Sequence, residues 1–255
     1  MQGKLLVLGL LAWSWGKSLA AAEWQQILDR GFLIVGVQEN NPPLASRNKS
    51  NELVGFEIDL AQELARQLLG SRDKVKLIPL KNTDRLEALW HDRVDMLIAQ
   101  MTVTGNRSRL VVFSPSYYTD RAVIIYPKTK LLKSLARPQI AVLHQSSNIS
   151  VLQTELPQAR PIGVSSYQEG FTALLQGKID GMILDGLAAR SWLQTHPQIA
   201  LQTTAHFSSL AVALPQGIQY AELRQKTTKA IEVLKSEQWL TDRVKFWQLN
   251  PVEYK

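Results

Sequence analysis

The sequence predicts an α/β protein built from two lobes, each a mainly parallel sheet flanked by helices. Short runs of branched apolar residues alternate with amphipathic helical segments from residue 24 to residue 127, which is the rhythm of a parallel α/β sheet. The alternation restarts near residue 139, and no low-complexity linker separates the two halves. Two amphipathic helices close the chain. If they return to the first lobe, the chain crosses between the lobes twice.

The first half contains three expected strands and three expected helices. Residues 55–70 carry the clearest helical pattern, because Leu60, Leu64 and Leu68 recur at every fourth position and Gly70 closes the segment. Residues 38–52 contain two prolines and several asparagines, and we predict a loop there. The expected strands are residues 32–37, 75–80 and 95–99, and the expected helices are residues 24–30, 55–69 and 84–92.

The second half repeats this rhythm, although not the sequence itself, so it is no internal repeat. We expect lobe 1 to contain residues 23–124 and 208–255, and lobe 2 to contain residues 125–207. The expected strands are residues 121–127, 139–143, 159–164, 180–185, 199–203 and 208–215, and the expected helices are residues 148–156, 167–178, 186–196, 220–236 and 237–248.

Residues 1–22 have the composition of a cleavable signal peptide. Lys4 is followed by an apolar run and then by three alanines that suit a signal peptidase. The run is short for a membrane span, so the alternative of an uncleaved anchor is disfavoured. The chain has no cysteine, which excludes disulfides, thiolate metal sites and a cysteine-linked lipid anchor. We therefore expect an exported protein whose mature chain starts near Glu23.

The charge pattern argues against a nucleic-acid partner. The formal net charge is +7, but the basic residues are scattered and no stripe of alternating basic and aromatic residues occurs. The four histidines, at positions 91, 144, 196 and 206, show no metal-ligand spacing, and none pairs with a serine and an acid as a catalytic triad. We expect no metal and no cofactor.

Five segments, in order and spacing, resemble the bacterial extracellular solute-binding proteins of family 3. They are GFLIVGV, LVGFEIDLAQELA, RLEALWHDRVDMLIAQMTVTGNRSRLVVFSPSYY, IAVLHQSSN and GKIDGMILD. The resemblance implies a two-lobed periplasmic-binding-protein fold of type II, with two hinge strands that cross near residues 121–126 and 206–211. It also implies a monomeric periplasmic receptor that closes on a polar L-amino acid and delivers it to the permease of an ABC importer.

The resemblance assigns the ligand's α-carboxylate to Arg107, the last residue of the T-x-x-R pattern that starts at Thr104. A planar guanidinium donates two parallel hydrogen bonds to a carboxylate, which a buried charge requires. Thr102 matches a family position that contacts the ligand, although a threonine also suits a strand or turn. Arg109 lies outside the pattern and is expected at the surface.

Three residues of the second lobe complete the expected site. Ser146 and Ser147 open a helix, where exposed N–H groups favour an anion, although serine also caps helices in this position. The family usually has glycine where this chain has Gln145. Asp185, at the end of a predicted strand, is expected to hold the α-ammonium rather than only to cap the following helix.

Amide residues are expected around the ligand's side chain. Asn41 stands at the approximate position of the family's stacking aromatic, and Asn82 and Gln100 fall near other pocket positions. These amides favour glutamine, glutamate or asparagine as the ligand, and Glu39 is the only nearby carboxylate for a cation.

Two alternatives to a transport receptor remain open. One is an enzyme like the periplasmic dehydratases of cyclohexadienyl substrates, which resemble this family and need a general acid in the cleft. The other is a sensor that signals through a partner protein. We expect a receptor that does not turn its ligand over.

Overall fold

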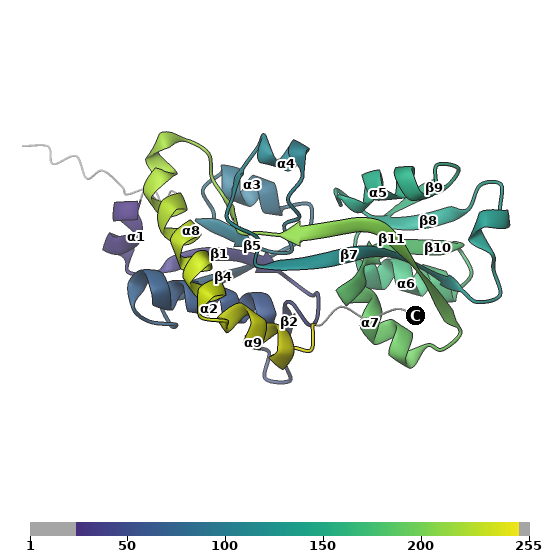
Figure 1. The fold of residues 1–255 in the computed structure, drawn as a ribbon, viewed down its shortest axis with the longest axis horizontal. Coiled ribbons are helices and arrows are strands. Elements are labelled where there is room, and N and C mark those ends of the chain that lie inside the picture. The colour runs from purple at the N-terminus through teal and green to yellow at the C-terminus, as the bar shows by residue number, and fades with distance from the viewer. Residues whose placement is uncertain (1–23, 250–255) are drawn as a thin grey trace, which may run out of the picture.

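A computed structural model describes residues 24–249, and these residues form two lobes side by side (Figure 1). The predicted signal peptide lies outside the described residues. Within the described range, no helix is long and apolar enough to cross a membrane. Each lobe contains a five-stranded sheet with helices packed on it. The two-lobed α/β fold that the sequence predicts is therefore confirmed.

The sheet of lobe 1 has the strand order β4-β1-β5-β12-β6. Strand β1 pairs in parallel with β4 and β5, and β12 pairs antiparallel with β5 and β6, so the sheet is mixed. The strands are β1 (Leu33–Gln38), β4 (Val75–Leu80), β5 (Met96–Ile98), β6 (Val112–Phe113) and β12 (Ala213–Leu214). The helices are α1 (Trp24–Arg30), α2 (Phe56–Leu69), α3 (Arg85–Trp90), α4 (Gly105–Ser108), α8 (Ala221–Ser236) and α9 (Trp239–Phe246).

The sheet of lobe 2 has the strand order β11-β7-β10-β8-β9 and is also mixed. Strands β10, β8 and β9 are parallel, and the antiparallel pairs come from the two strands that connect the lobes. The strands are β7 (Tyr118–Pro127), β8 (Gln139–Leu143), β9 (Arg160–Val164), β10 (Gly181–Asp185) and β11 (Ile199–Leu210), and the helices are α5 (Asn148–Glu155), α6 (Tyr167–Leu175) and α7 (Gly186–Thr195). Two short 3₁₀ turns cover Leu132–Ser134 and Ile218–Tyr220.

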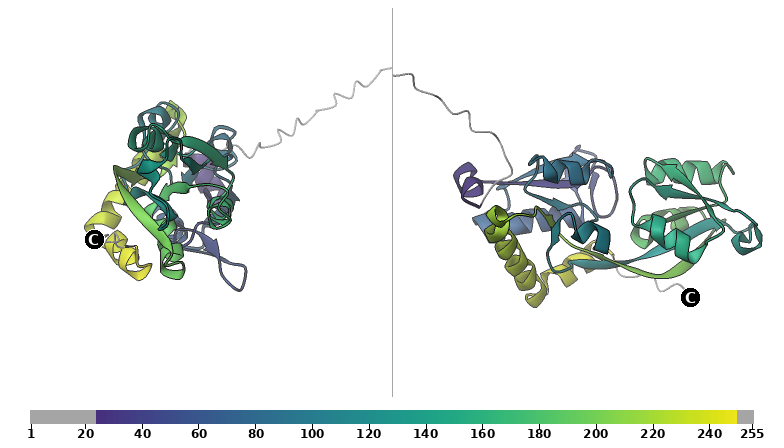
Figure 2. Two further views of the ribbon diagram at one scale, coloured as in Figure 1. Left: turned by 90° about the vertical axis from the view of Figure 1, so that its right-hand side faces the viewer. Right: turned by 90° about the horizontal axis from the view of Figure 1, so that it is seen from above.

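Strands β7 and β11 run as an antiparallel pair from one lobe to the other (Figures 1 and 2). The sequence predicts two separate strands at residues 199–203 and 208–215, but the structure has one strand from Ile199 to Leu210. The polar residues between the predicted strands form a bulge instead of a break, and the Thr204 hydroxyl donates to the Ala122 carbonyl at 2.7 Å. Strand β7 begins to pair with β10 of lobe 2 at Ala122. The residue limits of the lobes stay a prediction.

Four short elements were not expected. The predicted loop 38–52 holds the first strand of a small hairpin, formed by β2 (Ser46–Arg47) and β3 (Leu53–Val54). Helix α4 and strand β6 are four and two residues long, too short for a periodic signal. Helix α2 matches its prediction, because Leu60 and Leu64 are fully buried and Gly70 caps the helix with φ 82°.

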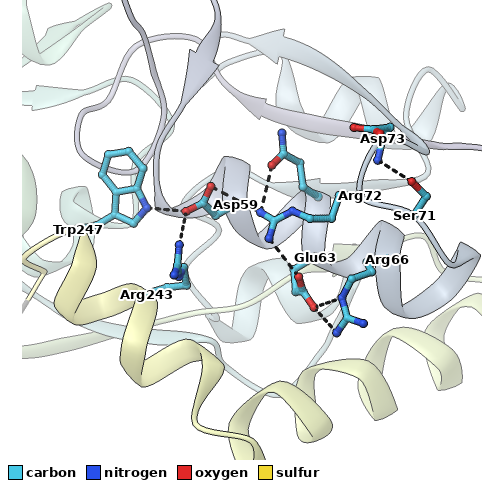
Figure 3. Close-up of polar contacts among 9 residues, drawn as sticks. Asp59, Glu63, Arg66, Ser71, Arg72, Asp73, Arg243 and Trp247 are labelled. Atoms are coloured by element: carbon cyan, nitrogen blue, oxygen red, sulfur yellow. Dashed lines mark hydrogen bonds and ion pairs between the residues drawn. The ribbon is translucent and has the colours of Figure 1, made fainter.

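The two C-terminal helices pack on lobe 1, where polar contacts tie α9 to α2 (Figure 3). The Trp247 indole N–H donates to Asp59 Oδ2 at 2.8 Å, and Arg243 lies 3.6 Å from the same oxygen. One turn further along α2, Glu63 pairs with Arg66 at 2.6 Å and with Arg72 at 3.4 Å. The chain end is therefore anchored to the lobe in which the described chain begins.

Candidate functional site

Arg107 projects from α4 toward the opposite lobe. Thr104 is the N-cap of this helix, and its hydroxyl accepts the Arg107 backbone N–H at 3.3 Å. The guanidinium donates to the Thr102 carbonyl from Nη1 and to the Gln145 carbonyl of lobe 2 from Nη2, each at 3.2 Å. The side chain is therefore oriented by its own lobe and meets the backbone of the other. Burial lowers the pKa of Arg107, and the charge of Asp185 acts against this shift.

Asp185 ends β10 inside the second lobe and is 5% exposed. Its carboxylate makes no capping bond to α7. It accepts instead from the Tyr167 hydroxyl and, at 3.4 Å, from the Asn148 amide. Burial raises the pKa of Asp185, while these two hydrogen bonds and the charges of Arg107 and Arg85 counteract the shift.

Asp120, on the hinge strand β7, lies beside Asp185 and was not predicted. It accepts the backbone N–H groups of Arg121 at 2.8 Å and of Leu187 at 3.3 Å, so it satisfies a donor in the first turn of α7. Burial together with the charge of Asp185 raises the pKa of Asp120 to about 7. No local sequence pattern marks this residue, which stands one position before the expected strand 121–127.

Asp120 makes the stability of the ligand-free protein depend on pH. Its pKa is about 7 in the folded chain against 3.8 normally, so between these values the folded chain holds a proton that the unfolded chain has released. We expect the free energy of unfolding to fall as the pH rises through this window, with Asp120 contributing a few kcal/mol at ~1.36 kcal/mol per pKa unit. Asp120→Asn removes the titrating group and keeps an acceptor for one of the two N–H groups, so it should lower the overall stability but reduce the fall with pH.

Urea unfolding of the wild type and of Asp120→Asn at pH 4, 5.5 and 7 measures this effect. The surface carboxylates are common to both proteins, so the difference reports Asp120 together with its effect on the neighbouring Asp185. Equal pH dependence in the two proteins would contradict the assignment.

The two candidate serines stand at the start of α5 in different roles. Ser146 Oγ accepts the Asn148 N–H at 3.1 Å, so this hydroxyl caps the helix, the alternative considered from the sequence. Ser147 is the N-cap by position and makes no side-chain capping bond. Gln145, where the family usually has glycine, adopts φ 56°, a left-handed conformation that glycine reaches without strain. Its carbonyl is the one that Arg107 contacts.

Gln100 and Asn41 form a buried amide pair beyond the carboxyl ends of β5 and β1 in lobe 1. Asn41 Nδ2 donates to Gln100 Oε1 at 2.7 Å. The Gln100 backbone N–H donates to Glu57 Oε1 at 2.7 Å, and the Tyr117 hydroxyl donates to the same oxygen at 2.5 Å. Burial raises the pKa of Glu57. Glu57 and Tyr117 thus hold the backbone of Gln100, which has a φ of 51°. The sequence did not predict this role of Glu57, because its position fits the helical pattern of α2.

The Asn82 side chain bonds residues of both lobes. Its Oδ1 accepts from Arg85, and its Nδ2 donates to the His144 carbonyl of lobe 2. Arg85 is 3% exposed and also donates to the Ala99 carbonyl. Burial, followed by the charge of Arg107, lowers the pKa of Arg85 to about 10. Sequence reasoning missed Arg85, because an arginine in a short amphipathic helix ordinarily points to solvent.

A cavity of about 110 Å³ lies between the lobes. Its polar buried wall comes from Gln38 and Asn41 of lobe 1, and its apolar wall comes from Leu80 of lobe 1 and Leu143 of lobe 2. Asn82 also lines it, together with Tyr167, which bonds Asp185. Residues 24–249 contain no group of three or more histidine, aspartate or glutamate side chains that could hold a metal ion.

A family model of the bacterial extracellular solute-binding proteins, family 3, matches residues 33–250. Among curated proteins, ABC transporter arginine-binding protein 1 of Escherichia coli (strain K12) is 30% identical over 202 residues, which cover 78% of this chain and 79% of that protein. The glutamine-binding protein GlnH of Bacillus subtilis (strain 168) is 26% identical over 62% of this chain and 60% of its own length. A cyclohexadienyl dehydratase of Pseudomonas aeruginosa is 24% identical over 95% of this chain and 92% of its own.

Solved structures share the fold. A cysteine-binding protein from Campylobacter jejuni superposes with a TM-score of 0.82 at 21% identity, covering 91% of this chain and 96% of that one. An ancestral arginine-binding protein bound to glutamine superposes with a TM-score of 0.76 at 26% identity, covering 86% of this chain and 98% of that one.

Proposed function

Because the chain belongs to the bacterial extracellular solute-binding proteins of family 3, we propose that it captures a free polar L-amino acid between its lobes and delivers it to the permease of an ABC importer. Relatives named for arginine and glutamine binding support the amino-acid class. The signal-peptide composition of residues 1–22 supports a periplasmic location. The receptor acts as a monomer and needs no cofactor, because the site's charges come from side chains.

The observation that carries this proposal is a pair of opposite charges contributed by different lobes, a half-buried arginine and a buried aspartate. Arg107 reaches from lobe 1 to the Gln145 carbonyl of lobe 2, and Asp185 is buried in lobe 2. A ligand carboxylate on Arg107 and a ligand ammonium on Asp185 would satisfy both charges at once. We expect the Thr102 hydroxyl and the Ser147 backbone to add contacts to the carboxylate, because the N-terminus of α5 favours an anion.

Hinge closure explains how one ligand joins both lobes. The two lobes are connected by β7 and β11, and the ligand would replace the bond between Arg107 and the Gln145 carbonyl. The free energy of these contacts then stabilises the closed form, which the permease can distinguish from the open form.

An enzyme of the dehydratase kind is the second candidate, and Asp120 is the observation that favours it. A buried carboxyl with a pKa near 7 can supply a proton at neutral pH, as a general acid in the cleft must. The receptor function is preferred because Asp120 is not among the residues that line the cavity and its carboxylate already accepts two backbone N–H groups.

Isothermal titration calorimetry of the mature protein against the common L-amino acids tests the receptor function. We expect saturable binding of at least one polar amino acid, with the ligand recovered unchanged after overnight incubation. The same protein is incubated with prephenate as a cyclohexadienyl substrate. Failure to bind any amino acid would overturn the proposal, and product formed from prephenate would favour the enzyme.

A further inference from the structure

The cavity between the lobes has a wall that is polar but carries no buried charge. Gln38 and Asn41 are 8% and 5% exposed, and Leu80 and Leu143 are 8% and 7% exposed. The two charged residues in the lining, Glu39 and Lys81, are exposed and opposite in sign. A charged ligand side chain placed here would lose its hydration without a buried partner of opposite charge.

Two buried amide groups have an unpaired atom: Gln38, which lines the cavity, and Gln100, which lies behind the lining residue Asn41 and accepts a hydrogen bond from it. Gln38 Oε1 is a buried acceptor without a partner among residues 24–249, and Gln100 Nε2 is a buried donor in the same condition. The donation from Asn41 to Gln100 Oε1 fixes which end of the Gln100 amide is the free one. Buried polar atoms left unpaired are rare in native proteins, so a ligand is a physical reason for both.

Glu57 does not supply the missing charge for a cationic ligand. Its Oε1 accepts from the Gln100 backbone N–H and the Tyr117 hydroxyl, and burial raises the pKa of the carboxyl, which favours its neutral form. Its Oε2 is buried without a partner among residues 24–249, but Glu57 is not among the residues that line the cavity.

Resting on the proposed function, we propose that the receptor selects an amino acid with an uncharged side-chain carboxamide, L-glutamine or L-asparagine. The ligand's amide N–H donates to Gln38 Oε1, and its amide oxygen accepts from the Gln100 and Asn41 pair. Leu80 and Leu143, from opposite lobes, enclose the methylene groups.

This selectivity differs from that in the name of the arginine-binding relative. An arginine side chain would bring a permanent cation to a wall of amides and leucines, and glutamate would bring an anion. Glutamine and glutamate have nearly the same shape. A preference for one of them therefore reports how the cavity responds to side-chain charge, and not how well it fits side-chain size.

Calorimetry of the mature wild-type protein with L-glutamine, L-asparagine, L-glutamate and L-arginine tests the inference. We expect one of the two carboxamides to bind at least ~30-fold more tightly than glutamate or arginine. Arginine, glutamate or another amino acid binding within threefold of the better carboxamide would overturn the selectivity alone. Absence of binding by every amino acid would instead overturn the proposed function, and the selectivity with it.

The variant Gln38→Glu tests the role of the free acceptor. It places a carboxylate in the wall, so arginine affinity should rise at least ~10-fold relative to glutamine affinity. Gln225→Glu, the same change on the exposed face of α8, is the matched control and should leave this ratio unchanged. An unchanged ratio in folded Gln38→Glu, checked by its melting curve, would show that Gln38 does not face the ligand.

Discussion

Replacing Arg107 by alanine is expected to weaken amino-acid binding by roughly 100- to 1000-fold. The variant leaves the ligand's carboxylate buried without its counter-charge, and removing one partner of a buried charge pair costs about 2–5 kcal/mol. The fold should tolerate the change, because the guanidinium bonds only two carbonyl groups and α4 retains its Thr104 cap. Calorimetry with the preferred amino acid measures the loss, and thermal unfolding without ligand checks the fold.

Two further variants separate charge from geometry. Arg107→Lys keeps the positive charge but loses the planar fork, so we expect an affinity between those of the wild type and the alanine variant. Arg109→Ala removes an exposed arginine two residues away and should leave the affinity within twofold. If the Arg107→Ala protein bound its ligand within threefold of the wild type, the carboxylate would have another partner.

The second large effect is expected at Asp185. Asp185→Asn keeps hydrogen-bonding capacity toward Tyr167 but removes the negative charge that meets the ligand's ammonium. We expect a loss of at least ~100-fold in affinity for the same physical reason as at Arg107. Asp180→Asn is the control, because Asp180 pairs with Lys130 at 2.6 Å on the lobe 2 sheet and belongs to no ligand contact proposed here.

The pH dependence of binding gives a second readout for Asp185. Burial raises the pKa of this carboxyl in the ligand-free protein, and the ligand's ammonium pairs only with the ionised form. Affinity should therefore fall as the pH decreases through this raised pKa, and the fall should be smaller in Asp185→Asn. A wild-type affinity that is constant between pH 4 and pH 8 would contradict this account.

The sequence predicted the elements that have a long periodic pattern. Helix α2 is recognisable because a fourteen-residue helix repeats its apolar face several times. Strand β11 was divided because polar residues at its centre hide a strand that continues through a bulge. Helix α4 was missed because four residues contain a single turn. Local pattern length thus limits what can be predicted.

The candidate site likewise contains residues that the sequence named and residues that it did not. Arg107 and Asp185 were named from motif positions, and their roles as ligand contacts stay predictions. Asn82 lines the cavity and also bridges Arg85 and the His144 carbonyl, and its contact with a ligand side chain stays a prediction. Asp120, Glu57 and Gln38 act through burial and through neighbours distant in sequence, which no local pattern contains. Only the folded arrangement reveals them.

A crystal structure of the mature protein with its preferred amino acid tests the central claim most directly. We expect the ligand between the lobes, with its carboxylate on both Nη atoms of Arg107 and its ammonium on the carboxylate of Asp185. The present bond from Arg107 to the Gln145 carbonyl should be replaced by the bond to the ligand. An amino acid bound outside this cleft, or bound within it without contact to Arg107 and Asp185, would contradict the account.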